Sequence, residues 1–247
     1  MGGISKKFFF LSLIFIGIGM VLFYGIKMQY FIHIGKKIAA KAVPYEQHPI
    51  NPTHSILTIG DSSVVGTGAT VPQTSVAGRL GAAYPQADII NLGVNGARLA
   101  DIPPRLTAVK GQTFDLVLIH IGGNGIVRFT SFKEAEKNLT NLLMSAKQLS
   151  STVVILHGGD IGSSTIFPPG FRYVLHKRSV RMRDIFIRVT QETETHYVDL
   201  FRSKQNDPFY LNPTRYYAPD FFHPSDAGYG YWYTEIQTVL EQINWNK

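Results

Sequence analysis

Three residues of the kinds that together activate a hydroxyl group stand at informative places in this chain. Ser62 directly follows a short apolar run, and Asp220 precedes His223 by three residues, just before the last predicted helix. A serine hydroxyl becomes a nucleophile when a histidine accepts its proton, and an aspartate in the same turn can hold the other ring nitrogen. The sequence therefore predicts attack by Ser62, with His223 as general base and Asp220 as the residue that orients it.

Attack on a carbonyl also needs hydrogen-bond donors where negative charge develops. The candidates for this oxyanion hole are the backbone N–H groups of Ser62 and Gly96 and the side-chain amide of Asn124, which stand in turns after three different apolar runs. Each residue also has a plain structural interpretation. Ser62 and Asp220 could be helix caps, Gly96 could serve a turn that needs positive φ, and Asn124 could only brace the loops.

Two further histidines stand at predicted strand ends and are alternative bases. His120 has no acid at the spacing seen between Asp220 and His223, whereas Asp160 follows His157 closely. We expect neither to replace His223, because neither has an acid three residues before it.

The elements that must position these residues alternate along the chain. Five short runs rich in β-branched residues predict strands at Ser55–Ile59, Asp88–Leu92, Leu116–Ile121, Thr152–Leu156 and His196–Leu200. Helical patterns lie at Ser75–Ala83, Phe132–Leu149, Phe171–Glu192 and Ser225–Ile243, and a helix near Arg98–Ala108 is interrupted by two prolines. Strands alternating with helices predict a parallel sheet covered on both faces, with ligands gathering at the carboxyl ends of the strands.

Four short motifs in order give the chain a family resemblance. The stretch Ile59–Ser62 resembles the first block of the GDSL, or SGNH, hydrolase family, Asn91–Gly96 its second, Gly122–Asn124 its third and Asp220–His223 its last. The resemblance implies a flavodoxin-like three-layer α/β/α sandwich with a mostly parallel five-stranded sheet. It also implies hydrolysis of carboxylic esters without cofactor or metal, as in lysophospholipase-like bacterial esterases. Two departures are Ser63, where the family name has leucine, and Gly125, where many members carry aspartate.

The composition limits the chemistry and the classes of binding partner that the sequence allows. The 247 residues carry a net charge of +7 and no cysteine, which excludes thiolate nucleophiles and cysteine-bound zinc. The basic residues are dispersed, and no nucleic-acid motif accompanies them, so we expect no nucleic-acid partner. A cluster of Lys and Arg between residues 172 and 188 predicts either a solvated helix face or a surface that lies against anionic lipid headgroups.

The N-terminal segment predicts a membrane anchor. Phe8–Ile26 is uncharged and mostly apolar, and about 19 residues nearly cross a hydrocarbon layer of roughly 30 Å. This apolar core is longer than that of a cleaved signal peptide, and bulky residues occupy the place of a cleavage site. We expect an anchor at 1–27, an amphipathic or extended connector at 28–54 and a catalytic domain at 55–247. Lysines on both sides of the apolar segment leave its orientation open, and an extracytoplasmic, periplasmic-side domain is the expectation.

The sequence as a whole predicts a membrane-anchored serine esterase that acts on a lysophospholipid or another acyl ester. Three alternatives stay open. An acyltransferase or an O-acetyl esterase acting on cell-envelope sugars would use the same residues, and a membrane-tethered binding protein would use none of them for catalysis. Acyl-chain length and oligomeric state are not encoded in a form that can be read from the sequence.

Overall fold

A single parallel sheet organises the chain. The computed structural model describes the backbone of residues 2–245 and the side chains of residues 8–245. Within that part, five strands lie in the order β2-β1-β3-β4-β5, with bounds His54–Gly60 (β1), Ala87–Gly93 (β2), Leu116–His120 (β3), Val153–Leu156 (β4) and His196–Val198 (β5). All four neighbouring pairs are parallel. This is the strand order of a flavodoxin-like sheet, and the predicted fold class is confirmed.

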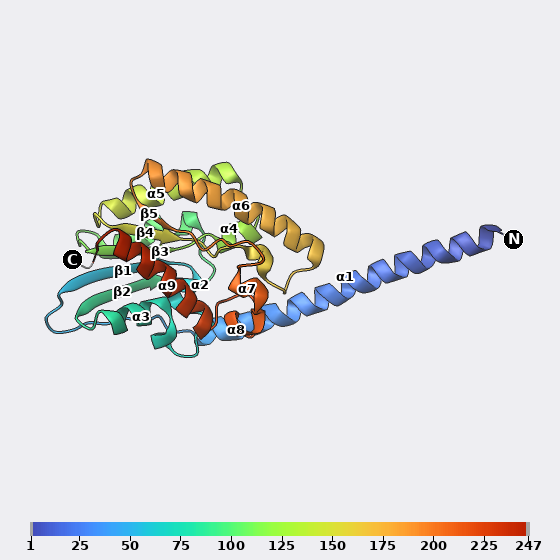
Figure 1. Cartoon of the computed structure of the whole chain (residues 1–247), viewed down its shortest axis with the longest axis horizontal. Coiled ribbons are helices and arrows are strands. Elements are labelled where there is room, and N and C mark those ends of the chain that lie inside the picture. The colour runs from blue at the N-terminus through green and yellow to red at the C-terminus, as the bar shows by residue number, and fades with distance from the viewer. Residues whose placement is uncertain (1, 246–247) are drawn as a thin grey trace.

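Helices cover both faces of the sheet and make three layers (Figure 1). Helices α5 (Phe132–Lys147) and α6 (Pro169–Glu192) pack on one face, and α3 (Val76–Ala83) and α9 (Asp226–Gln242) pack on the other. Neighbouring residues of a strand point to opposite faces, so Val117 joins the first core and Leu118 the second. Every residue of β3 is buried, as expected for a central parallel strand.

Local sequence signals explain where the long helices begin. In α5 the buried residues recur at helical spacing, and the side chain of Ser131 accepts a hydrogen bond from the backbone N–H of Glu134. Ser225 caps α9 in the same way through Gly228. The remaining short helices are α2 (Ser62–Val65), α4 (Gly123–Val127), α7 (Pro208–Leu211), α8 (Pro213–Tyr216) and four 3₁₀ turns, η1 (Pro72–Thr74), η2 (Leu99–Asp101), η3 (Pro103–Val109) and η4 (Ile161–Ser163).

The helix expected near Arg98–Ala108 is replaced by the two 3₁₀ turns η2 and η3. Pro103 and Pro104 have no backbone N–H to donate to the preceding turn, so a continuous α-helix cannot form there. The segment still buries Leu99, Ile102 and Leu106 against the core.

Helix α1 (Gly2–Lys41) differs most from expectation. It continues without a break through residues 28–41, where we expected an amphipathic or extended connector. Its first half projects away from the globular part (Figure 1), and the large apolar side chains between Phe8 and Ile26 are exposed. Of the described helices, α1 alone is long and apolar enough to cross a membrane, judged by length and composition.

Candidate active site

The first strand and the turn after it place Ser62 at the carboxyl edge of the sheet. Gly60 ends β1 so close to β3 that a side-chain Cβ there would collide with the carbonyl oxygen of His120. Asp61 then caps α2, because its carboxylate accepts hydrogen bonds from the backbone N–H and the hydroxyl of Ser63, at 2.9 and 2.8 Å. Ser62 is therefore the first residue of a helix, and its side chain is free to point away from the strand.

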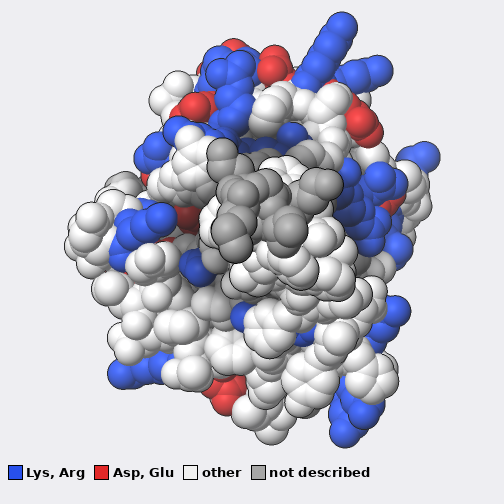
Figure 2. Space-filling model, turned by 90° about the vertical axis from the view of Figure 1, so that its right-hand side faces the viewer, with Lys and Arg blue, Asp and Glu red and all other residues white. Residues whose placement is uncertain are grey.

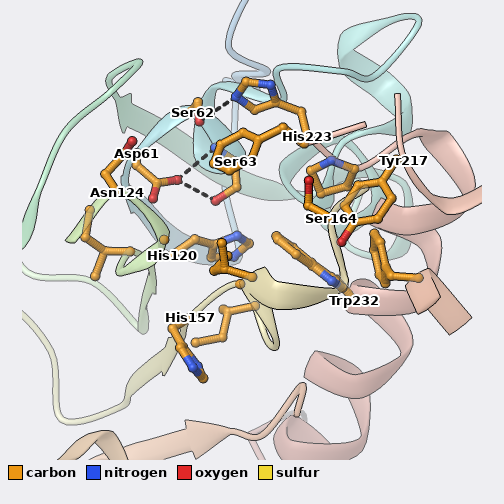
Figure 3. A pocket seen from close by; sticks show the side chains of 18 residues that line it. Asp61, Ser62, Ser63, His120, Asn124, His157, Ser164, Tyr217, His223 and Trp232 are labelled. Atoms are coloured by element: carbon orange, nitrogen blue, oxygen red, sulfur yellow. Dashed lines mark hydrogen bonds between the residues drawn. The ribbon is translucent and has the colours of Figure 1, made fainter. Parts of the chain in front are cut away.

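Three side chains form a hydrogen-bonded chain at this point. The Nε2 atom of His223 lies 3.0 Å from the Oγ atom of Ser62, and its Nδ1 atom lies 2.6 Å from Oδ2 of Asp220. Figure 3 shows the imidazole of His223 pointing at the Ser62 hydroxyl. The structure thus brings together residues that are 161 positions apart, at the edge where the strand order predicts a ligand site.

Asp220, the acid of these three hydrogen-bonded side chains, is buried and ionised. Asp220 is 1% exposed, and its Oδ1 atom accepts hydrogen bonds from the backbone N–H groups of Phe222 and His223, both at 3.0 Å. Burial alone would raise the pKa of this carboxyl, but the hydrogen bonds and charge attraction of His223 and the backbone donors outweigh it and lower the pKa. An ionised Asp220 can hold the Nδ1 proton of His223 and orient the ring.

The proposed oxyanion donors come from neighbouring loops. Gly96 has φ +78°, a backbone conformation that favours glycine, and Asn124 is the second residue of α4. The Asn124 amide donates one hydrogen bond to the carbonyl of Ala97 at 3.0 Å, which ties the two loops together, and a side-chain amide has a second N–H. Ser62 and Asn124 border the same cavity, whereas Gly96 is not among the residues that line it.

Comparison with known proteins identifies the family of this chain. A family model described as "GDSL-like Lipase/Acylhydrolase family" matches residues 58–231, which include all five predicted site residues. The chain belongs to this family. It is therefore a carboxylic ester hydrolase of the GDSL type, and the predicted resemblance is confirmed. A search of curated proteins finds no match.

Solved structures share the fold of this GDSL hydrolase. One is LAE5, an alpha/beta hydrolase enzyme from the metagenome of Lake Arreo, Spain, with 19% identity and a TM-score of 0.60, covering 77% of this chain and 96% of that one. Another is Axe2, an acetylxylan esterase from Geobacillus stearothermophilus, with 22% identity and a TM-score of 0.55, covering 78% and 96%. At such identities the likeness concerns the fold alone.

The catalytic edge of this GDSL hydrolase encloses a small cavity of about 60 Å³. Its lining includes Ser62, His223 and Asn124 together with His120, His157, Trp232, Tyr217 and Ser164, several of which Figure 3 shows converging below Ser62. Sequence reasoning missed Trp232 and Tyr217 as parts of the site. Trp232 lies in the last helix, outside the four motifs, and Tyr217 belongs to no motif.

His120 and His157, the two alternative bases, line this cavity, and neither is paired with an acid in the described part of the chain. His157 Nδ1 lies 2.7 Å from the Tyr197 hydroxyl, and neither ring nitrogen of His120 has a partner among the described residues. Asp160, the acid near His157 in sequence, is instead 2.7 Å from His176. Burial lowers the pKa of His120 to about 3 and that of His157 to about 4, so both rings are neutral in the folded protein. Within the described residues, no group of three His, Cys, Asp or Glu is placed to hold a metal ion.

These two buried rings predict a loss of stability in acid. Because the pKa of His120 falls from 6.5 to about 3 on folding, the unfolded chain binds a proton at pH 5 that the folded chain does not. Stability contributed by neutral His120 is complete above pH 6.5 and is lost as the pH falls toward 3, about 2 kcal/mol by pH 5. Urea unfolding in mild detergent, followed by tryptophan fluorescence at pH 7.5 and 5.0, measures the loss. His120→Phe should reduce the pH-dependent part by about that amount, and an identical pH dependence in the variant would contradict this assignment.

Proposed function

We propose that this GDSL hydrolase is a serine esterase in which Ser62 is the nucleophile, His223 the general base and Asp220 the orienting acid. The observation that carries the proposal is the chain of hydrogen bonds from Ser62 Oγ to His223 Nε2 and from His223 Nδ1 to Asp220 Oδ2. Nucleophile, base and orienter within hydrogen-bond reach are the geometric requirement for acyl transfer through a serine.

The reaction then has two steps. Ser62 Oγ attacks the ester carbonyl carbon while His223 takes the hydroxyl proton, and the developing oxyanion is stabilised by the Ser62 and Gly96 backbone N–H groups and the Asn124 amide. The carbon–oxygen bond to the alcohol breaks as His223 returns the proton to the alcohol oxygen. Water, deprotonated by His223, attacks the acyl-serine and releases the carboxylic acid and free Ser62.

The size of the cavity favours short acyl groups over the long chain of a lysophospholipid. A water-sized group needs about 10–15 Å³ of such volume, so about 60 Å³ holds about four to six of them. That is enough to surround an acetyl or propionyl group beside Ser62, whereas most of a fatty acyl chain would extend out of the pocket into solvent. The fold neighbour Axe2 is an acetylxylan esterase, which points the same way. We therefore propose O-acetylated sugars as the substrate class, with lysophospholipids as the less favoured candidate.

We also propose that α1 anchors the enzyme in a membrane, with residues 1–27 as the anchor, 55–247 as the catalytic domain and the domain on the extracytoplasmic, periplasmic side. The exposed apolar side chains of α1 support the anchor. Figure 2 looks along α1 at the face from which it projects, and Lys and Arg side chains are spread around that face. The aromatic and apolar residues Tyr173, Tyr210 and Leu211 are also exposed. Cationic and apolar groups together favour a surface that faces lipid headgroups.

A panel of p-nitrophenyl esters of graded chain length tests the substrate proposal. The full chain in detergent should hydrolyse the acetyl ester with a kcat/KM at least about tenfold above that of the octanoyl ester, because a chain that does not fit gains no binding energy in the transition state. A preference for octanoate, or release of fatty acid from a lysophospholipid at a comparable rate, would favour the lipid substrate instead.

The same panel separates hydrolysis from acyl transfer. With an added oligosaccharide acceptor, an acyltransferase forms an acylated sugar at the expense of free acid, whereas an esterase releases acid in both cases. A wild-type protein that hydrolyses no ester in the panel, and whose Ser62 is not labelled by a fluorophosphonate, would support the tethered binding protein and contradict the proposal.

A further inference from the structure

Helix α1 continues beyond its apolar half and lies along the catalytic edge of the domain. In residues 24–42 the half-buried positions recur every three or four residues, at Tyr24, Gly25, Lys27, Met28, Phe31, Ile34, Gly35, Ile38, Ala39 and Ala42. Tyr30, His33 and Lys37, on the opposite side, are exposed. This spacing places one face of the helix against the domain over about five turns.

That face touches three loops of the site edge in succession. Lys27 Nζ donates a hydrogen bond to the carbonyl of Thr165 at 2.8 Å, beside the cavity-lining Ser164. One turn further on, the ring of Phe31 packs edge-to-face on Phe221, with centroids 5.2 Å apart. Near the end of the helix, the side-chain amide of Asn95 donates to the carbonyl of Ala39 at 3.2 Å.

Gly35 lies directly against the acid of the proposed triad. A Cβ atom at Gly35 would stand 2.9 Å from Oδ2 of Asp220, which is closer than such atoms pack. Oδ2 is the carboxylate oxygen that holds His223 Nδ1, and the side chain is fully enclosed, so it cannot swing aside without losing that hydrogen bond. In contrast, Gly17, Gly19 and Gly25 of the same helix have nothing within 4 Å of a Cβ position.

The turn between Asp220 and His223 contains a strained residue that α1 supports. Phe221 has φ +53°, a left-handed conformation that costs a bulky residue stability and persists only where neighbours enforce it. The neighbours are Phe31, which packs on its ring, and Ser164, whose hydroxyl donates to its carbonyl at 2.6 Å. Residues of α1 therefore contact the turn at the acid and at the strained position.

We infer that the last turns of α1 are a positioning element of the catalytic site, in which Gly35 and Phe31 hold the Asp220–His223 turn in its productive geometry. This inference rests on the proposed triad. It means that the helix that would anchor the protein also forms the wall behind the catalytic acid, so anchoring and catalysis share one rigid element. Gly35 is required because any side chain would push the Asp220 carboxylate away from His223.

Alanine at Gly35 tests this inference in the full chain, with Gly25→Ala as the matched control in the same helix. With p-nitrophenyl acetate in detergent, Gly35→Ala should lower kcat by about 10–100-fold and leave KM within about threefold, since displacement of a catalytic group by an ångström can cost about 10²-fold. Gly25→Ala should keep the wild-type kcat. Wild-type turnover in Gly35→Ala would overturn the inference.

A double-mutant cycle separates positioning from a general structural effect. If Gly35 acts through Asp220, then adding Gly35→Ala to Asp220→Asn should change kcat by no more than about twofold. If Gly35→Ala lowered the kcat of Asp220→Asn by as much as it lowers the kcat of the wild type, Gly35 would act independently of Asp220. That result would contradict the inference.

A second pair of α1 variants tests the inference if Gly35→Ala does not fold. Phe31→Leu removes the ring that packs on Phe221, and Ile32→Val alters the neighbouring exposed residue. We expect a lower kcat at unchanged KM for Phe31→Leu only, and equal rates in both variants would overturn the inference. Absence of esterase activity in the wild type would contradict the proposed function. An active wild type whose Gly35→Ala and Phe31→Leu variants keep the wild-type kcat would contradict only the positioning role of α1.

Discussion

Ser62→Ala should reduce ester hydrolysis by about 10⁶-fold while leaving the fold intact. The substitution removes the only atom that forms a covalent bond with the acyl group in the proposed mechanism, and the residual rate comes from binding and the oxyanion donors. Ser62 Oγ is hydrogen-bonded to His223 and belongs to no helix cap, so its loss should cost little stability. Initial rates on p-nitrophenyl acetate and mass-spectrometric detection of fluorophosphonate labelling measure the effect.

Ser63 provides the matched control for Ser62. It is the next residue in the same short helix and equally buried, but its hydroxyl donates to Asp61 at 2.8 Å instead of contacting His223. Ser63→Ala should lose about 1 kcal/mol of stability from that hydrogen bond and keep its kcat within about tenfold. If Ser63→Ala were the inactive variant, or if Ser62→Ala still reacted with the fluorophosphonate at a serine of this site, the assignment of the nucleophile would be wrong.

Asp220→Asn should lower kcat by about 10⁴-fold with little change in KM. The asparagine keeps the shape of the side chain but can present an N–H to His223 Nδ1, which favours the tautomer with its proton on Nε2, where the ring cannot accept the proton of Ser62. The pKa of Asp220 is lowered mainly by its bonds to His223 and the backbone, against the opposing effect of burial, so the wild-type residue is ionised throughout the neutral range. Steady-state kinetics on the acetyl ester at pH 7.5 give both parameters.

Another aspartate–histidine pair with a buried acid, Asp160 and His176, serves as control. Asp160 Oδ2 lies 2.7 Å from His176 Nδ1, and Asp160 is nearly as buried as Asp220, but no serine hydroxyl is hydrogen-bonded to His176 among the described residues. Asp160→Asn should therefore retain kcat within a few fold while losing a similar hydrogen bond. Equal losses in the two variants would mean that Asp220 supports the fold rather than the reaction.

The proposed catalytic residues could be selected from the sequence because each is tied to a local pattern. Ser62 follows a strand and opens a helix, and Asp220 and His223 share one turn, so their mutual geometry is set by a few residues of backbone. Alternation of apolar runs with helical patterns then required a parallel sheet, whose carboxyl ends meet at one edge. Ser62 and His223 are 161 residues apart and meet because the fold brings their two turns to the same edge of the sheet. No short sequence pattern indicates that contact.

Other parts of the site were not predictable for equally physical reasons. Asp160 is close to His157 in sequence, but its carboxylate pairs with His176 of α6, because side-chain direction at a strand end depends on the packed neighbours. Trp232 lies within the last helix, outside the four motifs, yet the fold places it on the wall of the cavity that Ser62 also lines. Cavity volume depends on how whole helices seat on the sheet, and no short pattern records it.

Periodicity in the sequence was enough to predict the fold class, and four short motifs were enough to predict the family and the order of the proposed catalytic residues. No sequence pattern indicated that residues 28–41 extend α1 along the edge of the site or that Gly35 lies against Asp220. A helix's own pattern specifies which of its faces is apolar, whereas the surface that covers that face depends on long-range packing of the complete chain.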